Sequence, residues 1–255
     1  MRRFYIATDQ ISTDEPQLTG SDAHHLCTVL RLKAGDRIVV FDGSGKHYQA
    51  LIKAADRKNV KLAIEHRLPE QSESSLDLTL AQGFLKDKKM DLLVRQLTEL
   101  GVTRLIPYFA RRSVPSPDTN RLRARYRRWG KITHEAMKQC GRSRPMALTP
   151  ATSFDQALEM ARSHDLRLIF WEQVSGLPPS RMGDYQKPAS LFVMIGPEGG
   201  FEPAEIEKAK AEGFVAVSMG PRILRAETAA LVASTLVQFR FGDMGQKLLD
   251  NPEGV

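Results

Sequence analysis

The chain has 255 residues, of which 42% are hydrophobic, and its 37 Lys and Arg against 30 Asp and Glu give a net charge of +7. This composition excludes an intrinsically disordered protein. The sequence contains no run of 18 or more apolar residues, so it predicts no membrane-spanning helix. The first residues lack the apolar run of a signal peptide. The two cysteines, Cys27 and Cys140, form no metal-binding motif. We therefore expect a soluble cytoplasmic protein without a bound metal.

The positive charge is concentrated in one part of the chain. Residues 111–146 contain 11 basic and two acidic residues, whereas residues 147–255 have a net charge of −4. Guanidinium groups bind phosphate oxygens well. Two carboxylates are too few to neutralise the 11 basic residues of this segment through ion pairs along a helix. We expect a polyanionic partner for residues 111–146; the alternative is a solvated helix face.

The first part of the chain consists of short segments rich in β-formers, separated by turn residues. The expected strands are Arg37–Phe41, His47–Ala54 and Asn59–Leu68. Between the first two, residues 42–45 read Asp-Gly-Ser-Gly, like a cofactor-binding loop. Such a loop must open a helix, but a strand follows here, so we interpret it as a hairpin turn. Residues 1–72 are therefore predicted to form a small β-barrel, followed by a polar linker.

From residue 73 onward, strands alternate with helices. We expect strands at 76–80, 104–109, 166–171, 191–195 and 214–219, and helices at 90–100, 119–140 (one helix or a pair), 203–212 and 226–239. The near-continuous apolar runs at 166–171 and 191–195 are typical of strands buried on both faces of a parallel sheet. Residues 73–255 are therefore predicted to form an α/β domain.

Glycine-rich loops follow two of these strands. Residues 196–201 read Gly-Pro-Glu-Gly-Gly-Phe, and residues 219–229 read Met-Gly-Pro-Arg-Ile-Leu-Arg-Ala-Glu-Thr-Ala. Open α/β sheets bind ligands at this edge, and glycine allows close backbone approach. Neither loop matches a P-loop or a GxGxxG motif, which favours an uncharged or cationic ligand with an adenine-like ring. The alternative is a pair of tight strand–helix turns.

Together with residues 24–36, 86–102 and 135–142, these loops resemble the RsmE-type family of SPOUT methyltransferases, which methylate uridine N3 in 16S rRNA. The resemblance covers nearly the whole chain. It implies a PUA-like RNA-binding β-barrel over residues 1–72 and an α/β domain with a trefoil-knotted parallel sheet over residues 73–255. It further implies a homodimer, S-adenosyl-L-methionine (SAM) as cofactor, and 16S rRNA or the small ribosomal subunit as partner.

The resemblance also implies which residues hold SAM. They are Gly196, Pro197, Glu198, Gly199, Gly200, Met219, Gly220, Ile223, Leu224, Arg225 and Thr228. Uridine N3 must lose a proton before or during attack, which calls for a base and for a cation that stabilises the uridinate. We expect Arg225 to stabilise this charge or position RNA, and Glu227 to act as base or hydrogen-bonding partner. The alternative for Glu227 is helix N-terminal capping.

RNA contacts are expected on the barrel and on the basic segment. The candidates are Arg2, Arg3, His25, Arg31, Arg112, Lys138, Gln139 and Arg142. Because N3 lies on the Watson–Crick edge, the target base must be unpaired or extruded. Two alternatives stay open: a SPOUT enzyme acting on tRNA or on a ribose 2′-hydroxyl, and a non-catalytic RNA-binding assembly factor.

Overall fold

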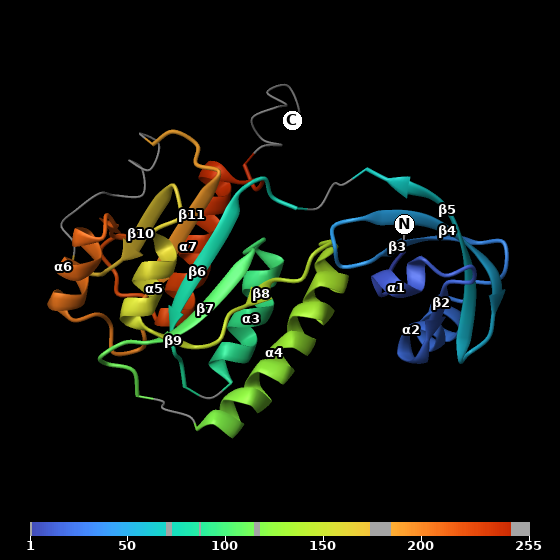
Figure 1. Cartoon of the computed structure of the whole chain (residues 1–255), viewed down its shortest axis with the longest axis horizontal. Helices are drawn as coiled ribbons and strands as arrows, with labels where there is room; N and C mark the ends of the chain where they lie inside the picture. The colour runs from blue at the N-terminus through green and yellow to red at the C-terminus, as the bar shows by residue number, and fades with distance from the viewer. Residues whose placement is uncertain (1, 70–72, 87, 115–117, 174–184, 246–255) are drawn as a thin grey trace. The chain divides into compact units, whose positions relative to one another are not determined.

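The computed structural model describes residues 2–69, 73–86, 88–114, 118–173 and 185–245. The chain forms two compact units (Figure 1). The first comprises Met1–Glu73 together with Met137–Pro145, and the second comprises Ser74–Ala136 and Met146–Val255. The sequence placed a boundary after residue 72 but did not predict that residues 137–145 belong with the N-terminal unit.

The first unit is built on a five-stranded sheet. In sheet order its strands are β1 (Arg3–Tyr5), β3 (Arg37–Phe41), β4 (His47–Ala55), β5 (Asn59–Leu68) and β2 (Gln17–Thr19). Short helices α1 (Thr8–Ile11), α2 (Gly20–His24) and the π-helix η1 (His25–Val29) complete it. β3 and β5 have the predicted bounds and β4 is one residue longer. The core, with Leu26, Ile38 and Val60 fully buried, lies between this sheet and the short helices.

The turn between β3 and β4 confirms the hairpin interpretation of residues 42–45. Asp42 Oδ1 accepts hydrogen bonds from the Ser44 amide (2.8 Å) and hydroxyl (2.7 Å). Gly43 and Gly45 have φ of 78° and 105°, which only glycine adopts without strain. The loop therefore connects two antiparallel strands and opens no helix.

The second unit contains a parallel sheet of seven strands. In sheet order these are β12 (Val215–Val217), β10 (Leu166–Phe170), β11 (Ser190–Ile195), β6 (Asp77–Gly83), β7 (Arg104–Phe109) and β8 (Ala147–Leu148), with β9 (Thr152–Ser153) also paired to β7. Helices are α3 (Lys89–Glu99), α4 (Thr119–Cys140), α5 (Phe154–Ala161), α6 (Pro203–Ala211) and α7 (Ala226–Phe241); the last four residues of α4 belong to the first unit. This confirms the predicted α/β class, and α4 is one continuous helix.

Helices cover both faces of this sheet. Side chains of α3, α4 and α7 pack with alternate strand residues such as Leu80 and Val193, whereas α5 and α6 pack with the intervening ones such as Ala81 and Phe192. Both faces of β6, β10 and β11 are thus buried, which explains their apolar runs. Among the described residues, no helix is long and apolar enough to cross a membrane.

Candidate active site

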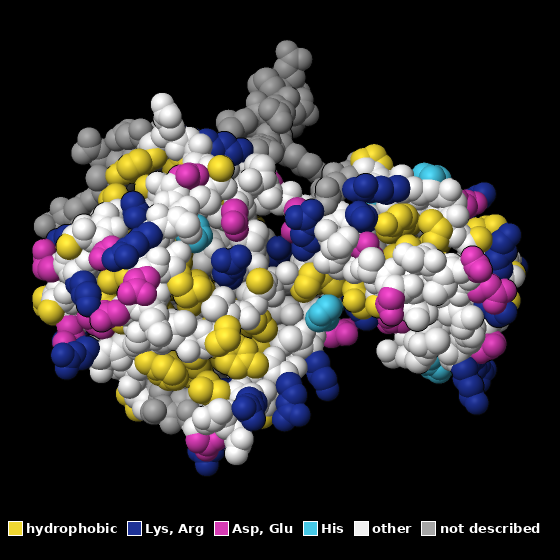
Figure 2. Space-filling view, viewed as in Figure 1, with side chains coloured by type: hydrophobic (Ala, Val, Ile, Leu, Met, Phe, Trp, Pro, Cys, Tyr) yellow, Lys and Arg dark blue, Asp and Glu magenta, His cyan; other side chains and the backbone are white. Residues whose placement is uncertain are grey.

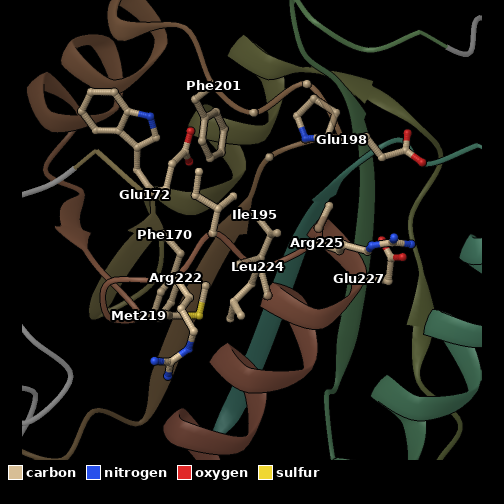
Figure 3. Close-up of a pocket in the computed structure, with 18 of the residues that line it drawn as sticks. Phe170, Glu172, Ile195, Glu198, Phe201, Met219, Arg222, Leu224, Arg225 and Glu227 are labelled. Atoms are coloured by element: carbon tan, nitrogen blue, oxygen red, sulfur yellow. The ribbon is translucent and has the colours of Figure 1, made fainter.

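A cavity of about 410 Å³ lies at the carboxyl ends of β10, β11 and β12 (Figure 3). It is lined by Lys89, Phe170–Glu172, Ile195–Phe201, Met219, Gly220, Arg222–Glu227 and Ala229. The two glycine-rich loops therefore meet at one site, as expected for the edge of an open α/β sheet.

The first loop is held by the strands beneath it. Gln82 Nε2 donates to the Gly196 carbonyl (3.0 Å), and the buried Tyr108 hydroxyl donates to the Ile195 carbonyl (2.9 Å). A Cβ on Gly83 would clash with the backbone nitrogen of Pro197, so β6 needs glycine where the loop crosses it. Gly200 turns the chain with φ of 70°. These contacts fix the loop backbone before any ligand binds.

The second loop leads from β12 into α7. Gly220 has φ of 102°, and a Cβ there would meet open space, so the backbone is accessible. Met219 and Leu224 are partly buried and, with Phe170 and Ile195, form an apolar floor (Figure 3). This floor suits the face of a flat ring.

Charged groups line the cavity beside this floor. Lys89 Nζ lies 2.9 Å from Glu198 Oε1 and 3.6 Å from Glu227 Oε1. The hydrogen bond to Glu198 raises the pKa of Lys89 above its ordinary value, so the ammonium stays charged at neutral pH. Glu227 Oε2 is buried and has no partner among the residues that the structure describes. Figure 3 shows Arg225 and Glu227 together at one end of the cavity and Glu172 at the other.

For the alternative role of Glu227 at a helix N-terminus, the structure shows a first-turn position but no capping hydrogen bond at the N-cap of α7. Glu227 lies in the first turn of α7, but no side chain caps this helix, and Arg225 occupies the N-cap position. Its carboxylate faces Lys89 instead. Arg225 itself is exposed at the cavity wall.

Ten of the eleven residues expected to hold the cofactor line the cavity. The exception is Thr228, which is exposed and lies outside the lining. Sequence reasoning missed Lys89, Arg222 and the segment Phe170–Glu172. This segment follows β10 at the same sheet edge, so the rule that selected the two loops could also have selected it.

The lining fits a cationic adenosyl cofactor. Three carboxylates, those of Glu172, Glu198 and Glu227, line the cavity together with the cations Lys89, Arg222 and Arg225. Glu198 and Glu227 pair with Lys89, and Glu227 Oε2 is buried without a partner among the described residues. A sulfonium or ammonium group is the kind of ligand that such acceptors stabilise. The apolar floor and glycine backbone suit the uncharged ring.

The residues expected to bind RNA lie mostly in the first unit. Arg2, His25, Arg31 and Gln139 are exposed there. Arg3 is half-buried and its Nη2 lies 3.0 Å from His47 Nε2, while Lys138 pairs with Asp22 (3.1 Å). Arg112 belongs to the second unit, where its Nη1 donates to the Gly199 carbonyl (3.3 Å) at the cavity.

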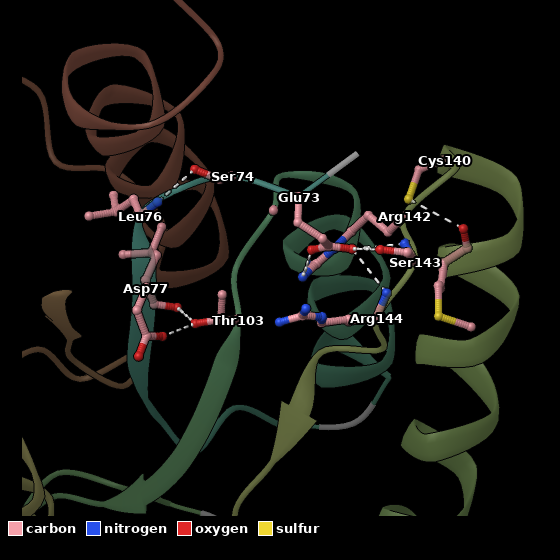
Figure 4. Close-up of polar contacts among 12 residues, drawn as sticks. Glu73, Ser74, Leu76, Asp77, Thr103, Cys140, Arg142, Ser143 and Arg144 are labelled. Carbon is pink, nitrogen blue, oxygen red and sulfur yellow. Dashed lines mark hydrogen bonds and ion pairs between the residues drawn. The ribbon is translucent and has the colours of Figure 1, made fainter. Parts of the chain in front are cut away.

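Arg142 has an environment that the sequence did not predict. Its side chain is 6% exposed, and its Nε and Nη2 both donate to Glu73 Oε2, at 3.1 and 2.9 Å (Figure 4). The other oxygen of Glu73 accepts the Ser143 and Arg144 amides. The pair ties residues 142–144 to the end of the N-terminal segment, and the guanidinium has almost no exposed surface for a phosphate.

Comparison with known proteins relates the chain to RNA methyltransferases. Models of an RNA methyltransferase domain and of an RNA methyltransferase PUA domain match residues 72–238 and 18–65. Ribosomal RNA small subunit methyltransferase E of Synechocystis is 35% identical, covering 91% of this chain and 75% of the relative. The Bacillus subtilis protein of that name is 28% identical, covering 94% and 97%.

A solved structure extends the likeness to the fold. Ribosomal RNA small subunit methyltransferase E from Neisseria gonorrhoeae, bound to S-adenosyl methionine, superposes with a TM-score of 0.82 at 31% identity, covering 96% of this chain and 99% of that one. The second unit thus has the SPOUT fold and the first is PUA-like. The chain belongs to the ribosomal RNA small subunit methyltransferase E family of RNA methyltransferases.

Proposed function

We propose that this protein transfers a methyl group from SAM to N3 of a uridine in the 16S rRNA of the small ribosomal subunit. One observation carries the proposal. Both glycine-rich loops line a single cavity in which Glu227 keeps a buried, unpartnered carboxylate oxygen. The Glu227 side chain as a whole is 24% exposed, so its carboxylate can accept a proton from a nucleobase presented at the cavity. The reaction takes place in the cytoplasm, where ribosomal subunits are found.

The protein's first task is to align cofactor and base. SAM, when bound, would supply a methyl group on a sulfonium: the N3 electron pair, in line with the carbon–sulfur bond, would bond to the methyl carbon while the thioether leaves with the electrons of the broken carbon–sulfur bond. The loop backbones at 196–200 and 219–220 would hold the cofactor, and the apolar side chains of Phe170 and Leu224, which line the cavity, would exclude water from it. Hydrogen bonds from Gln82 and Tyr108 already hold the backbone of the first loop in place. The loop therefore loses no conformational entropy when the reaction takes place.

The second task is to remove the N3 proton. In our proposal the Glu227 carboxylate, whose side chain is 24% exposed, takes it, while Lys89, with its Nζ 3.6 Å from Oε1, orients the carboxylate. Negative charge then spreads over the uracil ring, and the exposed guanidinium of Arg225, at the N-cap of α7, stabilises it. Lys89 remains an ammonium and takes no part in the proton transfer.

RNA docking falls to exposed cationic and polar groups of the PUA-like unit. We infer phosphate contacts for Arg2 and Arg31, with His25 and Gln139 as further contacts, because these side chains are exposed in the first unit. Arg112 lies at the cavity and can position RNA there.

We also infer a homodimer and a trefoil knot, as the family resemblance implies. The exposed apolar side chain of Ile223 supports the dimer, since it is 82% exposed in a loop that lines the cavity. Burial against a second copy would remove this apolar surface from water. Light scattering after gel filtration tests the dimer, and a monomeric mass would contradict it.

Labelled methyl transfer tests the activity. SAM with a labelled methyl group is incubated with 30S subunits, free 16S rRNA and tRNA, and the RNA is digested to nucleosides. We expect label in 3-methyluridine from the ribosomal substrates alone. Label in a 2′-O-methylated nucleoside or in tRNA would favour another SPOUT activity, and SAM binding without transfer to any RNA would favour an assembly factor.

Glu227→Gln tests the base. Loss of a general base lowers kcat by about 10²- to 10⁴-fold, whereas SAM affinity measured by calorimetry should change little. Glu99→Gln, at an exposed position of α3, is the matched control and should keep full turnover. Unchanged turnover of Glu227→Gln across the pH range would refute the assignment.

A further inference from the structure

The basic residues of α4 differ in whether they have partners. Arg121 pairs with Asp118 (3.3 Å) and Arg128 with Asp91 (2.7 Å), and Arg125 lies 5.4 Å from the centroid of the Phe84 ring. The remaining three in the second unit are Arg123, Arg127 and Lys131. All three are exposed, and within the described part of the chain no carboxylate pairs with them. We call these three residues the α4 stripe.

The spacing of the α4 stripe places its charges in a row. Positions four apart lie on the same face of a helix, about 6 Å apart along its axis. Figure 2 shows Lys and Arg side chains gathered over α4 beside a hydrophobic area. Like charges at this spacing destabilise a helix, and an anion with regularly spaced charges would offset the repulsion. A nucleic acid backbone is such an anion.

A hollow borders the stripe. Arg123 and Arg127 line it together with Leu122, Tyr126, Pro150 and Ala151, and Thr119 and Asn120 add polar groups. The Tyr126 hydroxyl donates to the Thr149 carbonyl (2.9 Å), which fixes its ring. An apolar floor with polar groups beside two guanidinium groups suits an unstacked base whose own phosphates lie on the stripe.

Contacts within the second unit fix α4 next to the active site. Trp129 Nε1 donates to Asp91 Oδ1 (2.9 Å), and Arg128 pairs with the other oxygen of the same carboxylate. Asp91 lies in the first turn of α3, two residues after Lys89, which lines the cavity. RNA bound along α4 would therefore lie on a helix anchored to the active-site wall.

We propose that the α4 stripe binds successive phosphates of a single-stranded RNA segment, with an unpaired base of that segment in the adjoining hollow. The identity of this RNA as substrate rests on the proposed function. The contact is separate from the exposed groups of the PUA-like unit and gives the methyltransferase unit a phosphate-binding surface of its own.

The test compares two full-length triple variants with the wild type. Arg123→Gln/Arg127→Gln/Lys131→Gln removes the stripe. Arg162→Gln/Lys208→Gln/Lys210→Gln removes the same charge from exposed residues that already pair with carboxylates. Binding of a short single-stranded RNA, a duplex of the same sequence, 16S rRNA and 30S subunits is measured over a series of salt concentrations. SAM affinity and oligomeric state are measured in parallel.

The stripe variant should bind single-stranded RNA at least about tenfold more weakly in low salt. Its slope of log K against log salt should be shallower by about 2, since each lost phosphate contact removes about 0.7. SAM affinity and oligomeric state should not change, and the control variant should behave as wild type. The duplex should bind more weakly than the single strand to the wild type.

Several results would overturn the proposal. The first is a salt slope of the stripe variant equal to that of the wild type, and the second is an equal loss of RNA affinity in the control variant. The third is wild-type binding of the duplex as tight as that of the single strand, and the fourth is dissociation of a wild-type dimer into monomers in the stripe variant. Loss of binding to 30S subunits without loss on naked RNA would assign the stripe to a ribosomal protein instead. A wild type that transfers no methyl group but shows the stripe-dependent slope would refute the proposed function alone.

Discussion

Two arginine–glutamate pairs of this protein share one chemistry and differ in burial. Arg142 in the PUA-like unit contacts Glu73 through Nε and Nη2, and its side chain is 6% exposed. Arg162 in the α/β unit contacts Glu212 through the same two nitrogens, at 2.9 Å each, with its side chain 59% exposed. Water screens the exposed Arg162–Glu212 pair but not the buried Arg142–Glu73 pair. Loss of the buried pair should therefore lower the free energy of unfolding much more than loss of the exposed pair.

The largest effect is expected from breaking the buried pair. Glu73→Ala leaves the Arg142 guanidinium buried without its carboxylate and two amides without acceptors, which should lower the free energy of unfolding of the PUA-like unit by about 3 kcal/mol. Urea denaturation followed by a probe in this unit measures it. Glu73→Gln keeps an acceptor and should lose less. Equal stability of Glu73→Ala and wild type would refute the contrast.

Arg142 also provides a test on RNA. Arg142→Ala should weaken RNA binding only through the fraction of molecules in which the PUA-like unit is unfolded. For the folded protein, the slope of log K against log salt should match that of the wild type, because no phosphate contact is lost. If fully folded Arg142→Ala showed a shallower slope than the wild type, Arg142 would be a phosphate contact after all.

An intermediate effect is expected at Lys89, whose pairs are partly exposed. Lys89→Gln should lower kcat by about tenfold, because Glu227 loses the cation that orients it. Lys89→Arg should recover most of the activity. The pKa of Lys89 is raised above its usual value, so the wild-type pH profile near neutrality should not reflect its titration. Steady-state methyl transfer measures both variants, with exposed Lys88→Gln as control.

The sequence could predict features set by local patterns. Strand bounds such as Arg104–Phe109 followed from apolar runs and turn residues, and the two loops followed from glycine at the ends of buried strands. It could not separate Arg142 from Arg127, because charge counts are the same whether a side chain faces Glu73 or solvent. Lys89 was missed for a related reason: only the fold brings it to Glu198, which lies far along the chain.

A smaller effect, on the pH dependence of stability, is expected when the buried, neutral imidazole of His164 is replaced. His164 is 9% exposed, its Nε2 lies 3.1 Å from Thr79 Oγ1, and burial lowers its pKa below the ordinary 6.5. Protonation therefore favours the unfolded chain, and wild-type stability should fall as the pH drops below about 6.5 towards the folded-state pKa. In His164→Gln this fall should be shallower. Parallel curves of unfolding free energy between pH 7 and pH 5 would contradict the assignment.

The smallest effect is expected at the exposed pair. Glu212→Gln leaves Arg162 in water, so the free energy of unfolding of the α/β unit should change little, and that change should shrink in high salt. A double-mutant cycle with Arg162→Gln should give a coupling energy of the same small size, whereas the cycle for Arg142 and Glu73 should give several times more. Chemical denaturation of the single and double variants at low and high salt provides both cycles. Comparable coupling in the two pairs would mean that burial does not set their strength, and the contrast between the two units would fail.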